Sequence, residues 1–244
     1  MGEKGKVVGV YDSGIGGMTL LAECRRLLPQ QNFYYLGDNA NAPYGGKTKA
    51  ELLTLARRAF DYFLYLHVSA VVVACNTVTT ECIEELRAEY PFPVIGAEPA
   101  LRSAIDCKKL LVLATEATLR SEEFRRLKAE RKGGTVCFAP QKLVPEIERN
   151  APFLEKIGIA DHLPKISCDG VVLGCTHYVY LKKTISEFYN APCFDGNEGT
   201  AKQLKKVLFS SKINYVEGAK NGNLTFLGNF KVVNAYVYKQ MFSF

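Results

Sequence analysis

The chain has 244 residues, of which 48% are hydrophobic and 23% are charged, and its formal net charge is +6. A chain of this length and composition is an ordinary globular protein that can form one large α/β domain or two small ones. Its basic residues are scattered and occur at most as adjacent pairs. This distribution favours solvated helix faces over a nucleic-acid-binding surface, so we expect no nucleic-acid partner.

Neither a targeting segment nor a membrane span is apparent in the sequence. Residues 1–10 include lysines but lack the apolar stretch of a signal peptide. The most apolar run, residues 63–75, is shorter than a bilayer-spanning helix and contains His67 and Ser69. We therefore expect a cytoplasmic protein with no membrane partner.

The first half of the chain alternates short apolar runs with helix-length segments. Strands are predicted at residues 6–11, 33–36 and 68–74, and helices at residues 16–28, 49–66 and 79–89. Residues 68–74 are almost purely apolar, which is typical of a parallel strand covered on both faces. Between the second strand and the second helix lies a polar, glycine-containing loop, residues 37–48.

The same alternation restarts after Pro93. Strands are predicted at residues 109–114, 135–139 and 170–173, and helices at residues 121–131, 143–151, 152–161 and 178–189. Such β-α alternation predicts mostly parallel sheets with right-handed crossovers. The expected fold class is α/β, with two pseudo-symmetric α/β domains and the active site in the cleft between them.

Two segments of the sequence resemble each other and each contains a cysteine. Residues 71–77 (VVVACNT) and 171–177 (VVLGCTH) both run from an apolar strand through a cysteine to a polar pair. In open α/β sheets, ligands bind beyond the carboxyl ends of the strands. Two facing α/β units would therefore bring Cys75 and Cys175 into one cleft.

Cysteine chemistry has several possible interpretations here. None of the eight cysteines has C-x-x-C spacing, which disfavours a zinc ribbon or a thioredoxin-type site, and most should be reduced. Cys75 and Cys175 are either buried small hydrophobic residues or reactive thiols, and with His177 they also have the chemistry of a zinc site. His177 is placed to hold the proton of the Cys175 thiol. The remaining cysteines are interpreted as structural: Cys24, Cys82, Cys107, Cys137, Cys168 and Cys193.

Two glycine-containing segments suggest ligand-binding loops. Residues 12–17 (DSGIGG) follow the first strand and open a helix, but Thr19 stands where a dinucleotide fingerprint requires its third glycine. Residues 45–48 (GGKT) look like the end of a phosphate-binding loop, but Asn41 occupies the position of its first glycine. Residues 38–45 are either a loop that closes over a small polar substrate or a plain surface connection.

Taken together, these blocks resemble the glutamate racemase family of the aspartate/glutamate racemase superfamily. The resemblance rests on residues 12–17, 37–45, 74–77 and 173–178, with weaker blocks at 98–100, 114–121 and 143–148. After its second cysteine the family usually continues His-Tyr-Pro, whereas this chain has Val179-Tyr180 after Tyr178. Ala139-Pro140 stands where the family often has Cys-Pro, and residues 207–244 match only loosely.

The resemblance implies a racemase that needs neither a cofactor nor a metal. Racemisation removes the α-proton from one face and returns a proton to the other, so two groups on opposite sides are needed, and a thiol with a reference pKa of about 8.5 can serve as base or acid. By resemblance, Cys75 deprotonates D-glutamate with help from Asp12, and Cys175 deprotonates L-glutamate with help from His177. The implied substrate contacts are Asp12, Ser13, Pro43, Tyr44, Gly45, Asn76, Thr77, Thr118, Glu148 and Thr176.

The resemblance also suggests an organisation and a biological role. We expect one domain formed by residues 1–97 plus 206–244, a second formed by residues 98–205, and a homodimer. The product D-glutamate would supply peptidoglycan synthesis. Two alternatives remain open: a racemase of the same superfamily acting on aspartate or a hydantoin, and a non-catalytic, two-lobed ligand-binding protein.

Overall fold

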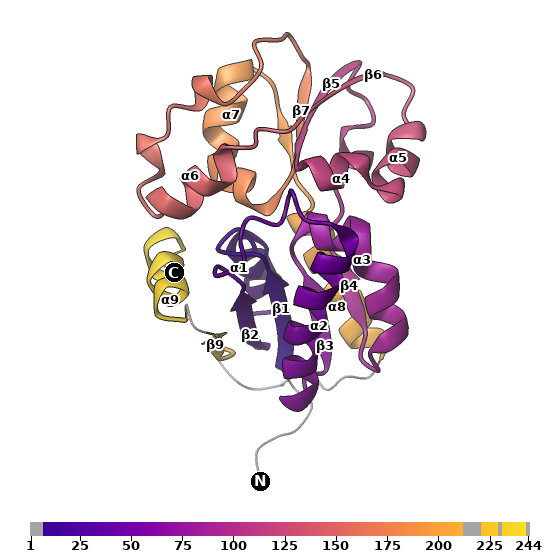
Figure 1. Ribbon diagram of the computed structural model, residues 1–244, viewed down its shortest axis with the longest axis vertical. Helices are drawn as coiled ribbons and strands as arrows, with labels where there is room; N and C mark the ends of the chain where they lie inside the picture. Colours follow the sequence, from indigo (N-terminus) through magenta and orange to yellow (C-terminus); the bar gives the residue numbers. More distant parts are fainter. Residues whose placement is uncertain (1–6, 212–220, 229–230, 243–244) are drawn as a thin grey trace.

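The computed structural model describes residues 7–211, 221–228 and 231–242 (Figure 1). These residues form two lobes, each built around its own β-sheet. We call them the first unit and the second unit. Among the helices in these ranges, none combines the length and the apolar character needed to cross a bilayer.

The first unit contains a five-stranded sheet in the order β4-β3-β1-β2-β9. All neighbouring strands run parallel. The strands are β1 (Val7–Asp12), β2 (Asn32–Gly37), β3 (Ala70–Val73), β4 (Val94–Gly96) and β9 (Leu224–Leu227). The helices are α1 (Met18–Leu27), α2 (Lys49–Tyr65), α3 (Asn76–Glu89), α8 (Asn197–Ser210) and α9 (Lys231–Met241), with α8 packed along α1.

The strands of this sheet are covered on both faces, as their apolar sequences require. In β3, Ala70 and Val72 pack in one core cluster with α1 and α8, while Val71 and Val73 pack in a second cluster with α2 and α3. Side chains along a strand alternate between faces, so an uninterrupted apolar run supplies both cores. The carboxyl ends of β1 and β3, which carry residues of the site, therefore belong to a sheet packed on both faces.

The second unit contains a four-stranded parallel sheet in the order β6-β5-β7-β8. The strands are β5 (Lys109–Ala114), β6 (Gly134–Phe138), β7 (Gly170–Gly174) and β8 (Cys193–Phe194). The helices are α4 (Glu116–Arg120), α5 (Glu122–Ala129), α6 (Leu143–Asn150) and α7 (Lys182–Tyr189). The 3₁₀ turns are η1 (Arg102–Ala104), η2 (Leu154–Lys156), η3 (Ile159–Asp161) and η4 (Thr176–Leu181).

The expected fold class, mixed α/β with parallel sheets in two units, is confirmed. One predicted helix is wrong: residues 152–161 form the two 3₁₀ turns η2 and η3, with Gly158 preceding the second. The helix predicted from residue 178 starts as the turn η4, which begins directly after Cys175. The short strands β4 and β8, the helix α4, and the elements α8, β9 and α9 were not predicted.

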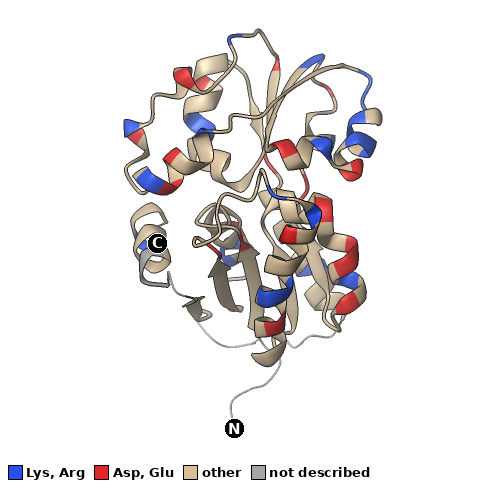
Figure 2. Ribbon diagram, viewed as in Figure 1, with Lys and Arg blue, Asp and Glu red and all other residues tan. Residues whose placement is uncertain are grey.

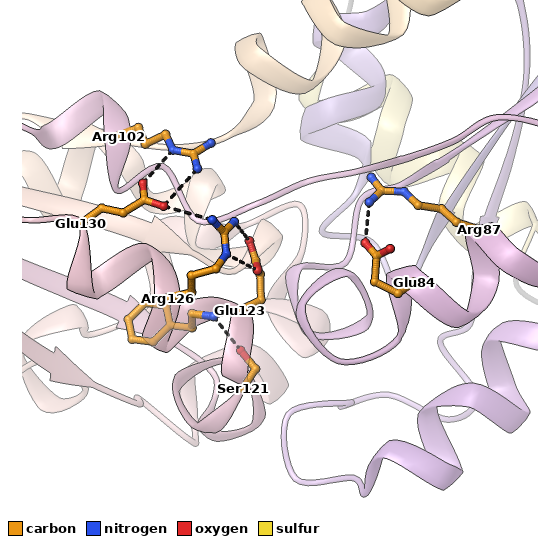
Figure 3. A network of polar contacts seen from close by, with 8 residues as sticks. Glu84, Arg87, Arg102, Ser121, Glu123, Arg126 and Glu130 are labelled. Carbon is orange, nitrogen blue, oxygen red and sulfur yellow. Dashed lines mark hydrogen bonds and ion pairs between the residues drawn. The ribbon is translucent and has the colours of Figure 1, made fainter.

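Charged side chains of both signs are distributed over the outer helices of both units (Figure 2). On α5, Arg126 pairs with Glu123 at 2.6 Å and with Glu130 at 3.1 Å, and Glu130 also contacts Arg102 at 3.2 Å (Figure 3). These pairs are exposed, so solvent screens them and they contribute little to stability.

Candidate active site

A cavity of about 300 Å³ lies between the two units at the carboxyl ends of their strands. Residues that follow β1, β3, β5, β6 and β7 contribute to it, as expected for an α/β sheet. Its lining consists of Ser13, Pro43, Tyr44, Gly45, Gly46, Cys75, Asn76, Thr77, Thr115, Glu116, Ala139, Pro140, Gln141, Val144, Cys175, Thr176, His177 and Tyr178. Both cysteines of the repeated segment therefore reach one cavity.

Cys75 lies two residues after the end of β3 and is the N-cap of α3. The pKa of this thiol is raised to about 12, mainly by burial and also by the nearby charges of Asp12 and Cys175, whereas hydrogen bonds from Val78 and Ser13 lower it. A thiol with this pKa is protonated near neutral pH. In the resting protein, Cys75 is thus a proton donor.

Cys175 follows β7 and has a different neighbour. Its sulfur lies 3.9 Å from Nδ1 of His177, whose Nε2 lies 2.6 Å from Oε1 of Glu148. Burial alone would lower the pKa of His177, but the hydrogen bonds to Cys175 and Glu148 raise it well above its ordinary value. His177 is therefore an imidazolium held between the thiol and the carboxylate, and it can stabilise a thiolate on Cys175.

Glu148 contacts both units through its two carboxylate oxygens. Oε1 accepts hydrogen bonds from Nε2 of His177 and, at 2.9 Å, from the backbone N–H of Ile15, while Oε2 accepts from Asn39 at 2.9 Å. Burial would raise the pKa of Glu148, but the imidazolium and these donors lower it below the usual value. The carboxylate is thus charged at neutral pH.

Asp12 lies behind the cavity and links the two halves of the site. It is fully buried, accepts a hydrogen bond from the Gly14 N–H at 3.1 Å, and accepts another from Oγ1 of Thr176 at 3.2 Å. Burial raises the pKa of this carboxyl, although the charge of His177 lowers it. The charge of Asp12 therefore raises the pKa of Cys75, and its carboxyl group also contacts the Cys175 loop directly.

The glycines of residues 12–17 leave room for the second unit. A Cβ on Gly14 would collide with the carboxylate of Glu148. One on Gly16 would lie 2.6 Å from Nδ1 of His177 and would also collide with Thr176. Glycine is needed at these positions because of close approach across the units, while the dinucleotide fingerprint weighed in the sequence is absent.

Residues 38–45 form one wall of the cavity. The hydroxyl of Tyr44 donates to Asp38 at 2.6 Å and lies 2.7 Å from the hydroxyl of Tyr11 on β1. The carbonyl of Gly45 accepts a hydrogen bond from the N–H of Ala117 in α4 at 3.1 Å. The loop is thus bound to the first sheet at Tyr44 and to the second unit at the next residue, Gly45.

A group of threonine hydroxyls lies beside this loop, since a Cβ added to Gly45 would lie 2.8 Å from Thr115. Oγ1 of Thr77 lies 2.9 Å from Oγ1 of Thr115, which donates to Thr118 at 3.0 Å. Thr118 itself is fully buried behind the other two. Asn76 uses its side-chain N–H to bind the carbonyl of Ala97 at 3.0 Å.

The structure brings most of the predicted site residues to the cavity surface. Those lining it are Ser13, Pro43, Tyr44, Gly45, Cys75, Asn76, Thr77, Cys175, Thr176 and His177. Asp12, Thr118 and Glu148 do not line it, and each contacts residues that do.

Several lining residues were not predicted. These are Gly46, Thr115, Glu116, Ala139, Pro140, Gln141, Val144 and Tyr178. Thr115 and Val144 belong to the weaker family blocks, and Ala139-Pro140 stands where the family often has Cys-Pro, so a closer inspection of these positions would have found them. Gln141 donates to the carboxylate of Glu116, a contact between two loops that sequence spacing does not reveal.

The lining has an uneven distribution of charge. Glu116 is its carboxylate, His177 is its ionisable nitrogen, and neither lysine nor arginine belongs to it. Among the residues that the structure describes, no group of three or more His, Cys, Asp or Glu is arranged to hold a metal ion. The zinc interpretation of Cys75, Cys175 and His177 therefore gains no support.

Comparison with known proteins gives the family. The model of the Asp/Glu/hydantoin racemase family matches residues 19–204. The chain is 39% identical to the glutamate racemase of Clostridium novyi over 221 residues, which is 84% of each chain. It is 37% identical to that of Clostridium acetobutylicum over 243 residues, covering 95% of this chain and 94% of the relative.

Solved structures give the same result. The glutamate racemase of Thermus thermophilus, solved in complex with β-chloro-D-alanine, has a TM-score of 0.79 and 30% identity, covering 99% of this chain and 95% of that one. The RacE1 isoform from Bacillus anthracis has a TM-score of 0.84 and 26% identity, covering 99% and 96%. The chain belongs to the Asp/Glu/hydantoin racemase family. Its relatives just described are glutamate racemases, so the resemblance identified in the sequence is confirmed.

Proposed function

We propose that this protein interconverts L- and D-glutamate without a cofactor, using Cys75 and Cys175 as its two acid–base groups. The observation that carries the proposal is the presence of both thiols in one interdomain cavity, each at the end of a buried parallel strand. The names of the relatives support glutamate as the substrate. A plain ligand-binding protein has no need of two thiols at matched positions.

In the direction from L- to D-glutamate, the thiolate of Cys175 removes the α-proton. The imidazolium of His177 stabilises that thiolate before the transfer, because it is held in its charged form by Glu148. The thiol of Cys75 then donates its proton to the opposite face of the α-carbon. Its raised pKa and the neighbouring carboxylate of Asp12 keep it in the protonated form that this step requires.

The reverse direction uses the same groups with their roles exchanged. After one turnover Cys75 is the thiolate and Cys175 the thiol, so the enzyme is ready to act on the D-enantiomer. Because the two enantiomers have equal free energy, kcat/KM must be equal in the two directions, and asymmetry between the thiols can affect only the separate values of kcat and KM.

The intermediate carries negative charge at the α-carbon and its carboxylate, and the site has to stabilise it with hydrogen-bond donors. We assign the α-carboxylate and ammonium groups to Ser13, Asn76, Thr77 and Thr176, which line the cavity near the thiols. Pro43, Tyr44 and Gly45 take the side-chain end. Thr118 acts through Thr77 and Thr115, and Glu148 acts through His177.

The proposal extends to the context of the enzyme. D-glutamate would be supplied to peptidoglycan synthesis in the cytoplasm by a homodimer. We also propose that the two domains predicted from the sequence, residues 1–97 plus 206–244 and residues 98–205, move as units during substrate entry, with the whole of α8 moving with the first unit because it packs along α1. The cavity between them would then open and close with that motion.

The test is an assay of L- and D-glutamate, by circular dichroism or a coupled enzyme, without any added cofactor. Aspartate and a hydantoin are assayed in parallel to separate the other substrates of the family. Cys75→Ala and Cys175→Ala should each abolish racemisation in both directions. Cys82→Ala, which alters a buried thiol on α3 outside the cavity, should keep near-wild-type turnover. Full activity in either of the first two variants would falsify the two-thiol mechanism.

A further inference from the structure

Tyr180 stands within the segment where the sequence departs from the family pattern after the second cysteine. It belongs to the turn η4, which starts directly after Cys175 and also contains His177. Its hydroxyl donates to the backbone carbonyl of Ile15, in the loop after β1, at 2.6 Å. The contact therefore joins the second unit to the first.

The second unit also binds the backbone N–H of Ile15. The N–H of Ile15 donates to Glu148 at 2.9 Å, so both polar backbone groups of Ile15 are bound by side chains of the second unit. Ile15 lies between Ser13, which lines the cavity, and Gly16, which packs against His177. This loop is thus held where its position affects both halves of the site.

A chain of aromatic rings supports Tyr180 from the other side. Its ring lies 6.0 Å from that of Phe242, and Phe242 lies 5.3 Å from Tyr238 on α9. Tyr238 lies 5.6 Å from Phe226 on β9, which lies 5.8 Å from Tyr35 on β2. Ring pairs at these distances attract each other through their edges and faces in addition to burying apolar area. The rings connect η4 to the first sheet through the C-terminal segment.

The two ends of this ring chain bind adjacent peptides. The hydroxyl of Tyr35 donates to the carbonyl of Gly14 at 2.6 Å, and that of Tyr180 donates to the carbonyl of Ile15 at 2.6 Å. The loop after β1 is therefore held from both units at successive residues. Removing the Tyr180 hydroxyl would leave the Ile15 carbonyl without this partner while the aromatic packing remained.

We propose that Tyr180 is a positioning residue of the racemase: by binding the Ile15 carbonyl, it sets the placement of the Cys175 turn relative to the loop that carries Ser13. This inference rests on the proposed function, since it concerns the geometry of that reaction. The two thiols belong to different units, so their relative position depends on contacts between the units. A misplacement of about 1 Å in such a site can reduce the rate by about 100-fold.

Tyr180 does not line the cavity, so it acts without touching the substrate. Its removal should therefore lower kcat more than it alters KM. The test compares Tyr180→Phe with Tyr189→Phe in the full-length protein. Tyr189 is a good control because it is also half-buried, and its hydroxyl donates to the carbonyl of Pro164 at 2.8 Å within the second unit.

We expect Tyr180→Phe to reduce kcat about tenfold in both directions with KM changed by less than about threefold. Tyr189→Phe should keep wild-type kinetics. Amide hydrogen exchange of a peptide spanning residues 13–17 should be faster in Tyr180→Phe than in the wild type or the control. Wild-type kcat in Tyr180→Phe, or exchange no faster than in the control, would overturn the proposal.

A second pair of variants tests the ring support if Tyr180→Phe folds poorly. Phe242→Leu should lower kcat in the same direction, whereas Phe188→Leu, which removes the ring packed 4.9 Å from Tyr189, should not. Equal kinetics in these two variants would overturn the proposal. The exchange measurement does not depend on turnover. A wild-type protein that fails to racemise glutamate would therefore reject the proposed function, and the exchange data would still test whether Tyr180 positions the loop.

Discussion

Oε1 of Glu148 lies 2.6 Å from Nε2 of His177 and 2.9 Å from the backbone N of Ile15. One carboxylate oxygen thus serves the imidazole beside Cys175 and the loop that follows β1. The charge on His177 and the contact between the two units depend on the same group. A substitution of Glu148 should therefore reduce turnover even though this side chain does not line the cavity.

The first prediction concerns that carboxylate. Glu148→Gln removes one of the contacts that raise the pKa of His177 against the effect of burial, so this pKa falls and the charged form of His177 beside Cys175 is less populated. We expect kcat to fall by about 100-fold. Glu146→Gln is the matched control, because Glu146 lies on the same helix and contacts His162 at 3.0 Å outside the cavity. Its kinetics should stay close to wild type; equal losses in both variants would contradict the assigned role.

The same ion pair has a pH window that follows from its pKa shifts. The pKa of Glu148 is lowered, so its contribution to stability is complete above the ordinary glutamate pKa of about 4.3 and is lost as pH falls through the folded-state value. The pKa of His177 is raised, so its contribution is complete below the ordinary histidine pKa of about 6.5 and is lost as pH rises through the folded-state value. The difference in Tm between wild type and Glu148→Gln should be largest between these limits. A difference that does not vary with pH would argue against an ion pair.

The second prediction distinguishes the two thiols by alkylation. Cys75 and Cys175 are 5% and 7% exposed, so access alone does not favour one of them. Iodoacetamide reacts with the thiolate form of cysteine. The charged His177 lies 3.9 Å from the sulfur of Cys175, whereas the pKa of Cys75 is raised to about 12, mainly by burial. Peptide mass spectrometry near neutral pH should find Cys175 modified first, with labelling of Cys75 increasing as pH rises. Preferential labelling of Cys75 at neutral pH would reverse the resting protonation proposed here.

The third prediction separates the two bases by stereochemistry. With a substrate analogue that carries a leaving group at its β-carbon, one deprotonation suffices, because elimination replaces reprotonation. Cys75→Ser retains the base Cys175 and should eliminate from the L-configured analogue. Cys175→Ser retains Cys75 and should eliminate from the D-configured one. The opposite pairing would reverse the handedness, and equal elimination of both enantiomers by both variants would mean that one base serves both faces.

The fourth prediction concerns the close approach at Gly16. In Gly16→Ala, the new Cβ lies 2.6 Å from Nδ1 of His177, so the histidine or the whole loop has to shift. We expect kcat to fall by about 100-fold, by the same argument from misplaced catalytic groups. Gly199→Ala is the control, since no atom lies within 4 Å of its added Cβ on α8 and alanine favours a helix by about 0.5–1 kcal/mol. Unimpaired turnover in Gly16→Ala would show that the two units have more freedom than the structure indicates.

The sequence predicted the strands that carry the thiols because their apolar character is continuous. β3 and β7 are buried on both faces, so residues 70–73 and 170–174 have the same apolar pattern, and a cysteine follows each within two residues. The neighbouring polar residues of the cavity followed from that placement. Parallel strands bring their carboxyl ends to one edge, so a pattern along the chain becomes a cluster in space.

Contacts between loops could not be predicted in this way. Glu148 reaches Ile15 from 133 positions along the chain, and Tyr180 reaches the same residue from 165 positions away. Neither contact has a periodicity or spacing that a single sequence reveals. The strands β4 and β8 were missed because three-residue and two-residue elements are too short to develop an alternating pattern.

The cavity lining lacks lysine and arginine, and this has a consequence for how an acidic substrate is held. Two carboxylates would be recognised by hydroxyl and backbone N–H donors at short range. No lysine or arginine attracts them from a distance, and the charge of the His177 imidazolium is already paired with Glu148. Dissolved salt screens the attraction between charges beyond about 8 Å at physiological ionic strength, but it does not weaken hydrogen bonds made at contact distance inside the pocket. The Michaelis constant should therefore stay nearly constant across a broad range of salt concentrations. Discrimination among dicarboxylates should depend on the length of the molecule, because only a chain that spans the cavity can bind both sets of donors.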